Sequence, residues 1–330
     1  MSKMTGLLVA GGVFGAVAAS ALATSVAPAP AQALDACFSS GLTGTLKTGS
    51  ASCSSSGPLQ WAIAIGANTT AEVSGGLFNL AIAVGESSFA GSEAFITGEG
   101  SSYFNIATAA AGGFARASDG IFQIANSRGE NSGAVATSGS FGVARAIGVN
   151  TLAEAGVLRD FDQASAFNIA RARGENSRAF AQSGFGNSSR AFGSGAIASA
   201  GYGNGNIAGA LGNGAVAEAR GDSSGADQSS FNIARVAGSG SIARAGAGGF
   251  DAAGQGNFNI ATVIGNGSLA DAGQGNLNAA RVFGNTSTAE AGPGNGRRAI
   301  VIGSNQVKSD PPRDASARRA AASVRSAPQR

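Results

Sequence analysis

A short motif that recurs along the chain constrains the fold more than any other feature of the sequence. The tetrapeptide FNIA occurs at Phe104–Ala107, Phe167–Ala170, Phe231–Ala234 and Phe258–Ala261, and looser copies begin at Phe78, Phe122, Phe141 and Leu277. Neighbouring copies are usually about 19 residues apart, or about 26 where an additional loop intervenes, and such periods are typical of solenoid proteins. The sequence therefore predicts a repeat protein in which each unit packs against the next.

One complete repeat unit, Phe258–Gly273, contains two halves with the pattern of β-strands. The first half is FNIATVIG and the second is SLADAG, and each ends in glycine. The pentapeptide RGENS occurs twice, at Arg128–Ser132 and Arg173–Ser177, which indicates internal duplication. We therefore expect an all-β fold, a parallel β-solenoid (β-roll or β-helix) of about ten coils with a period of about 19 residues.

Composition narrows the classes of function. Glycine accounts for 53 of 330 residues and charged residues for 12%, so the chain is too apolar for simple disorder and too rich in glycine for an ordinary helical domain. The chain has no histidine, the commonest general base and a frequent metal ligand. We expect a protein that is not an enzyme and that binds no cofactor.

The sequence divides into four segments. Residues 1–33 are typical of a secretory signal peptide, with Lys3, an apolar stretch and an A-x-A site ending at Ala33; a retained membrane anchor is the alternative. Residues 34–58 form a Ser/Gly-rich cap, 59–305 the repeat domain, and 306–330 a disordered basic tail. Cleavage near Ala33 predicts a secreted or cell-envelope location.

The only two cysteines, Cys37 and Cys53, lie at the start of the exported part. In an exported protein this pair predicts a disulfide bond. A lipoprotein attachment site at Cys37 is the alternative, although Asp35 fits such a site poorly and Cys37 lies far beyond the apolar stretch.

Side-chain alternation predicts which residues of the second half point inward. One face of its strand has Ser or Thr followed by two alanines, as in Ser268, Ala270 and Ala272. The opposite face contains charged residues, namely Glu72, Arg116, Glu154, Glu218, Arg244, Asp271 and Glu290. Burying a column of charges would cost several kcal/mol for each. The small residues should therefore form the interior.

The first half contains a stripe of large apolar residues. Its asparagines, at 79, 105, 168, 232, 259 and 278, share a face with small residues and should form an internal ladder of amide hydrogen bonds. If that face is interior, a Phe/Ile stripe faces outward, which is uncommon on a soluble monomer; otherwise the stripe is the interior of a wider coil. The candidate stripe comprises Phe78, Phe104, Phe122, Phe141, Phe167, Phe231, Phe258, Ile106, Ile169, Ile233 and Ile260.

Two stretches resemble a known family. WAIAIGANTTAEVSG from Trp61 and AIVIGSN from Ala299 resemble the repeats in the heads of trimeric autotransporter adhesins. The resemblance implies a β-roll with alanines inside each coil and larger aliphatic residues at a trimer axis. The period is longer here, and the C-terminus lacks that family's membrane anchor. GNGNIAGALGNG from Gly203 also resembles repeats of mycobacterial PPE proteins, so an actinobacterial type of exported Ala/Gly-rich repeat protein is expected.

Other motifs point to chemistry less specifically. GNG at Gly203 and Gly212 lies in repeat turns without a following helix, so we expect no nucleotide binding. GGFD at Gly248 occurs once, whereas a calcium β-roll needs it in consecutive coils. Arg220, Gly221 and Asp222 match an integrin-recognition tripeptide, which makes a host receptor a speculative partner. The basic tail has no interleaved aromatic residues, so we expect no nucleic-acid binding.

Together these features predict a structural or adhesive protein of the cell envelope. Its Phe/Ile stripe would mediate self-association, with a homotrimer as one form, or contact with envelope components. The alternative is a glycan-acting β-helix enzyme that uses loop acids, for which Asp160 and Asp162 are the closest pair and Asp222, Asp227 and Asp251 lie in the other loops. Ice binding would need regular threonine columns, which the sequence lacks.

Overall fold

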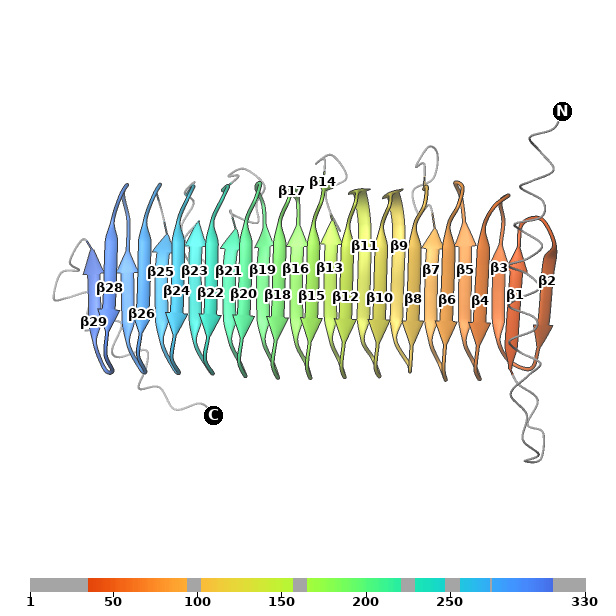
Figure 1. Ribbon diagram of the computed structural model, residues 1–330, viewed down its shortest axis with the longest axis horizontal. Helices are drawn as coiled ribbons and strands as arrows, with labels where there is room; N and C mark the ends of the chain where they lie inside the picture. Colours follow the sequence, from red (N-terminus) through yellow and green to blue (C-terminus); the bar gives the residue numbers. More distant parts are fainter. Residues whose placement is uncertain are drawn as a thin grey trace, which may run out of the picture. The chain divides into compact units, whose positions relative to one another are not determined.

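A computed structural model describes residues 35–93, 102–156, 165–220, 229–246, 256–273 and 275–310. Within these ranges the chain forms strands and turns but no helix, and almost all strands belong to two long sheets (Figure 1). The coil alternates between the sheets, so each strand pairs with strands of the preceding and following coils. This is the parallel β-solenoid expected from the repeats.

The first sheet contains the strands that follow the FNIA-type motifs. In spatial order its fourteen strands are β2 (Gly44–Thr48), β1 (Ala36–Ser40), β4 (Trp61–Ile65), β6 (Leu80–Val84), β8 (Ile106–Ala110), β10 (Ile124–Arg128), β12 (Val143–Ile147), β15 (Ile169–Arg173), β18 (Ser188–Phe192), β20 (Ile207–Leu211), β22 (Ile233–Ala237), β24 (Ile260–Ile264), β26 (Ala279–Phe283) and β28 (Arg298–Ile302). From β4 onward the pairing is parallel, and equivalent motif residues face each other, as Ala125 faces Ala107 and Ala144.

The second sheet contains the other half of each coil. Its fifteen strands are β3 (Ser52–Ser55), β5 (Thr70–Ser74), β7 (Phe89–Glu93), β9 (Phe114–Ile121), β11 (Gly133–Ser140), β13 (Leu152–Gly156), β16 (Arg178–Gln182), β19 (Ile197–Gly201), β21 (Val216–Arg220), β23 (Ile242–Gly246), β25 (Leu269–Gly273), β27 (Thr288–Ala291) and β29 (Val307–Asp310), together with the short β14 (Ser165–Ala166), which pairs with β11, and β17 (Gly184–Phe185), which pairs with β14.

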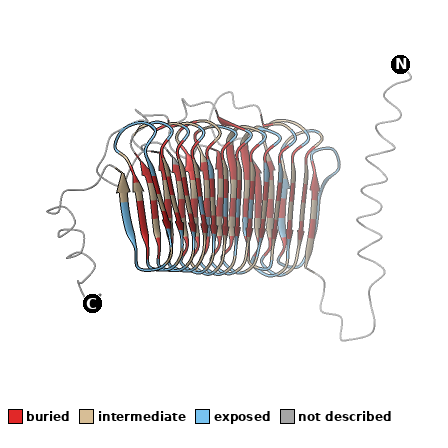
Figure 2. Cartoon of the chain, turned by 60° about the vertical axis from the view of Figure 1, so that its left-hand side comes forward, coloured by how far each residue is buried: buried red, intermediate tan, exposed pale blue. Residues whose placement is uncertain are grey.

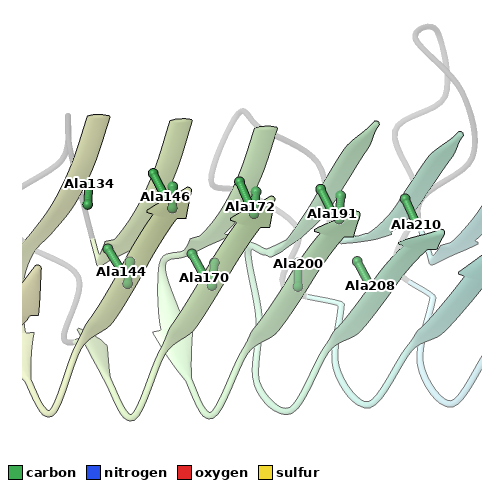
Figure 3. Close-up of a cluster of buried hydrophobic side chains, with 14 of the residues drawn as sticks. Ala134, Ala144, Ala146, Ala170, Ala172, Ala191, Ala200, Ala208 and Ala210 are labelled. Carbon is green, nitrogen blue, oxygen red and sulfur yellow. The ribbon is translucent and has the colours of Figure 1, made fainter. Parts of the chain in front are cut away.

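The interior between the sheets is made of small side chains. Alanines alternate with outward residues along the strands of both sheets, and Figure 3 shows them in columns across successive coils. Figure 2 shows the same alternation as buried and partly exposed bands along each strand. Among the described residues, no buried apolar side chain is larger than valine. Because protein interiors are close-packed, such a core holds the sheets too near each other for Phe or Ile to fit inside.

Glycine ends the first-sheet strands because the next coil passes very close. Gly265 has φ +140°, and a Cβ at this position would lie 2.0 Å from the carbonyl oxygen of Gly284. Side chains rarely adopt this backbone conformation, and the contact leaves no room for one. The glycine that closes these motifs is therefore required by coil stacking, except in the Phe104 copy, where Ala111 takes its place with φ +54°.

The N-terminal end differs from the rest of the solenoid. Strand β1 pairs antiparallel with both β2 and β4, so a hairpin covers the edge of the first parallel strand. Cys37 on β1 and Cys53 on β3 form the expected disulfide bond, with a Cα–Cα distance of 5.7 Å. The bond joins the two sheets at the end of the solenoid, where stacking against a preceding coil is missing.

One predicted boundary needs correction. Val307–Asp310, which we assigned to the disordered tail, forms β29 and pairs with β27. These residues have no repeat motif, but their backbone groups continue the hydrogen bonding of the last coil, as in the bond from the Gly292 N–H to the Asp310 carbonyl (3.0 Å). The remainder of the predicted tail, 311–330, lies outside the described residues.

Candidate interaction surface

The phenylalanines of the stripe lie on the outside of the solenoid, at the turns that lead into the first sheet. All seven are exposed, with 37–58% of each residue accessible to solvent. Of the four isoleucines, Ile106 is exposed and Ile169, Ile233 and Ile260 are half-buried on the outer face. Of the two orientations that the sequence left open, the stripe therefore takes the outward one, because alanine and asparagine occupy the interior.

Each phenylalanine precedes its strand instead of beginning it, which corrects our placement of Phe258 within a strand. Strand β24 starts at Ile260, and Phe258 lies two residues earlier with φ +58°. The other six phenylalanines have φ values of 56–59°. For a bulky side chain this left-handed conformation is unusual and costs about 1–2 kcal/mol. Gly186 and Gly205 occupy the equivalent place in two coils, with φ values of +69° and +65°.

The aromatic rings form stacks along the solenoid. Phe78, Phe104, Phe122, Phe141 and Phe167 make a continuous stack with ring centroids 4.9–5.1 Å apart and interplanar angles of 2–12°. After the coils with Gly186 and Gly205, Phe231 and Phe258 stack again at 5.1 Å. An aromatic pair contributes about 0.5–1.5 kcal/mol, which offsets much of the backbone cost. The outer edges of the rings stay open to solvent.

A buried asparagine follows five of the seven phenylalanines and holds the turn in place, whereas Gln123 and Gly142 stand at this position after Phe122 and Phe141. Asn259 is fully buried; its Nδ2 donates to the Gly275 carbonyl (2.8 Å), and its Oδ1 accepts from the Asn278 N–H (2.8 Å). The Asn259 N–H donates in turn to Asn232 Oδ1 (3.0 Å). This confirms the predicted asparagine ladder. The ladder also includes Asn187 and Asn206, which sequence reasoning missed because glycine replaces the preceding phenylalanine.

The charged column of the second sheet is also on the outside, as expected. Arg244 Nε lies 3.2 Å from Glu218 Oε2 on the neighbouring strand. Gln182 Nε2 donates to Glu154 Oε2 (2.9 Å). Burial raises the pKa of Glu154 above its ordinary value, and the bond from Gln182 and the charge of Arg178 oppose this shift. Arg244, Glu218 and Glu154 on this sheet therefore have partners within the protein.

Most other candidate residues cannot be placed. Asp160, Asp162, Asp227 and Asp251 lie outside the described residues, as do Gly221 and Asp222, whereas Arg220 ends β21. In the described part of the chain, no group of three or more acidic or cysteine residues is arranged to hold a metal ion. Nor does that part include a helix long and apolar enough to cross a bilayer.

Comparison with known proteins adds no relative. No protein-family model matches the chain, and no curated protein matches it. The features that bear on function are therefore those of the surface itself, namely an exposed aromatic stack on a solenoid closed by a disulfide bond.

Proposed function

We propose that the protein is an exported structural or adhesive component of the cell envelope, without enzymatic activity. The Phe/Ile stripe mediates its self-association or its contact with envelope components. The coil of about 19 residues, lengthened where a loop is inserted, is the unit that repeats this surface. Secretion through the N-terminal segment is part of the proposal and is consistent with a disulfide bond, since such bonds persist in oxidising compartments.

The observation that carries the proposal is the stack of exposed phenylalanines. Five rings in line span about 19 Å at the usual spacing of strands, with a column of half-buried or exposed aliphatic residues beside them. Large contiguous apolar patches of this kind typically mark interaction sites. The resemblance to adhesin heads, in which aliphatic residues meet at a trimer axis, makes a homotrimer the first form to test.

The test is the solution mass of the purified protein, measured by sedimentation. The stripe variant replaces Phe104, Phe122 and Phe141 by glycine, which the fold already accepts at positions 186 and 205. The control variant replaces Phe89 and Phe114, a stacked pair on the second sheet (5.2 Å), by alanine. We expect an oligomer that the stripe variant reduces to monomers and that the control leaves intact.

A separate experiment tests whether the stripe contacts envelope components. If the wild type is a monomer, it should co-sediment with isolated envelope, and the stripe variant should not. A monomer that binds neither envelope nor a hydrophobic dye would refute the role of the stripe. Fractionation of the native cells, with sequencing of the mature N-terminus, tests export and cleavage near Ala33.

A further inference from the structure

The outer face of the first sheet carries a line of arginines. Arg145 on β12 pairs in register with Arg171 on β15, which pairs with Arg190 on β18. All three are exposed. At the usual distance between strands, their Cα atoms follow one another at about 4.8 Å. After Gly209 on β20, the same column continues with Arg235 on β22. We call Arg145, Arg171 and Arg190 the arginine column.

Nothing in the first sheet compensates this charge. The charged residues in its strands are Lys47, Arg128, Arg145, Arg171, Arg173, Arg190, Arg235, Arg281 and Arg298, and none is acidic. The side chains of the arginine column form no hydrogen bond or ion pair with other residues that the structure describes. The second sheet differs, since Arg244 pairs with Glu218 and Gln182 with Glu154.

In-register like charges destabilise a sheet. Other coils show that different residues fit this column, because the equivalent positions are Thr108 on β8, Asn126 on β10 and Thr262 on β24. Three consecutive arginines are therefore not required by the fold. An anionic ligand that lies along the column would remove the repulsion.

We propose that the arginine column binds a linear acidic polysaccharide, with the polymer running across the strands. Guanidinium groups form paired hydrogen bonds with carboxylates, which favours a uronic acid polymer. An extended polyuronate carries one carboxylate on each sugar, so a single chain lying along the solenoid can bring carboxylates to a line of guanidinium groups. Val143 and Ile169, half-buried on the same outer face, lie beside the column and offer an apolar surface to the sugar rings.

The geometry favours a polysaccharide over other polyanions. Single-stranded nucleic acids bind by stacking bases on open aromatic faces, but Phe122 and Phe167 cover the two faces of Phe141 (5.1 and 4.9 Å), and Phe141 covers one face of Phe167. Beside Arg190, the phenylalanine is replaced by Gly186. The three arginines form a single line, which matches one extended chain better than the two-dimensional array of headgroups in a membrane.

This inference rests on the exported location in the proposed function but not on self-association. The stripe and the arginine column are different residues. Sedimentation of the stripe variants tests the first, and polysaccharide binding by the arginine variants tests the second, so the two can fail separately.

The experiment measures binding of oligomannuronate to the purified protein by calorimetry, with neutral oligomannose as the ligand control. The test variant carries Arg145→Gln, Arg171→Gln and Arg190→Gln. The matched control carries Arg318→Gln, Arg319→Gln and Arg325→Gln in the C-terminal segment and has the same net charge. We expect about a 10-fold loss of affinity in the test variant, a weaker salt dependence, and little change in the control.

Two single-residue variants test the proposal if the triple variant folds poorly. Arg171→Gln alone should weaken binding. Gly209→Arg should strengthen it by about threefold, because a side chain meets nothing within 4 Å there and would connect Arg190 with Arg235. Equal losses in the test and control variants would overturn the proposal. So would absence of oligomannuronate binding, or binding only to vesicles of anionic phospholipid.

Discussion

The asparagine ladder allows a sharp test of how the coils are held together. Replacing Asn259 by alanine leaves the buried Asn278 N–H without its side-chain partner, and it also removes a partner of the carbonyl of Gly275, which is only half-buried. Each buried polar group that loses its partner costs about 1–3 kcal/mol. Because water can reach the Gly275 carbonyl, the loss comes mainly from the Asn278 N–H, and we expect the free energy of unfolding to fall by about 1–3 kcal/mol.

The matched control is Asn266→Ala in the same coil. Asn266 Oδ1 also accepts a backbone N–H of the neighbouring coil, that of Ser239 (2.7 Å), but the residue is exposed. Water can replace that bond, so the loss should stay within about 0.5 kcal/mol. Urea unfolding followed by circular dichroism measures both variants, with the denaturant slope checked for each. Equal losses in the two variants would refute the argument that burial makes the ladder important.

Two other predictions concern stability. Because the folded state raises the pKa of Glu154, the unfolded chain loses its proton first, and stability falls as pH rises from about the ordinary value of 4.5. Glu154→Gln should remove this fall and leave the protein at least as stable at pH 7; thermal melting from pH 4 to 8 checks it, and an unchanged pH profile would contradict it. Replacing Cys37 and Cys53 by serine opens a link with a sequence separation of 16 and should cost about 3 kcal/mol. Urea unfolding measures this loss, and faster hydrogen exchange confined to β1–β5 would locate it.

Local pattern alone predicted the solenoid and its interior. Alternation placed Ser268, Ala270 and Ala272 on one face and Asp271 on the other, and the cost of burying charge selected the small residues as interior. The same argument predicted the asparagine ladder. These inferences succeeded because they need only the alternation of side chains along one strand and the cost of burying charge. Both can be judged from residues that are close together in the sequence.

The backbone conformation of the stripe could not be predicted in this way. A left-handed turn usually indicates glycine or asparagine, so the sequence FNIA was assigned to a strand from its first residue. In the structure, stacking between rings of different coils offsets the cost of that conformation at Phe258. The sequence also did not predict the role of Gln123, whose longer side chain takes the place of asparagine in the ladder. A Cβ on Gly142 would lie 2.0 Å from its Oε1, so the next coil has glycine there.

The sequence by itself determined the repeat, the strand alternation, the small-residue interior and the cysteine pair. The tertiary structure decided that the Phe/Ile stripe is exposed, that an antiparallel hairpin caps the first coil, and that the charges of the first sheet are all basic. The arginine column illustrates the reason. Arg145, Arg171 and Arg190 are far apart in the chain, and only the register between coils makes them neighbours.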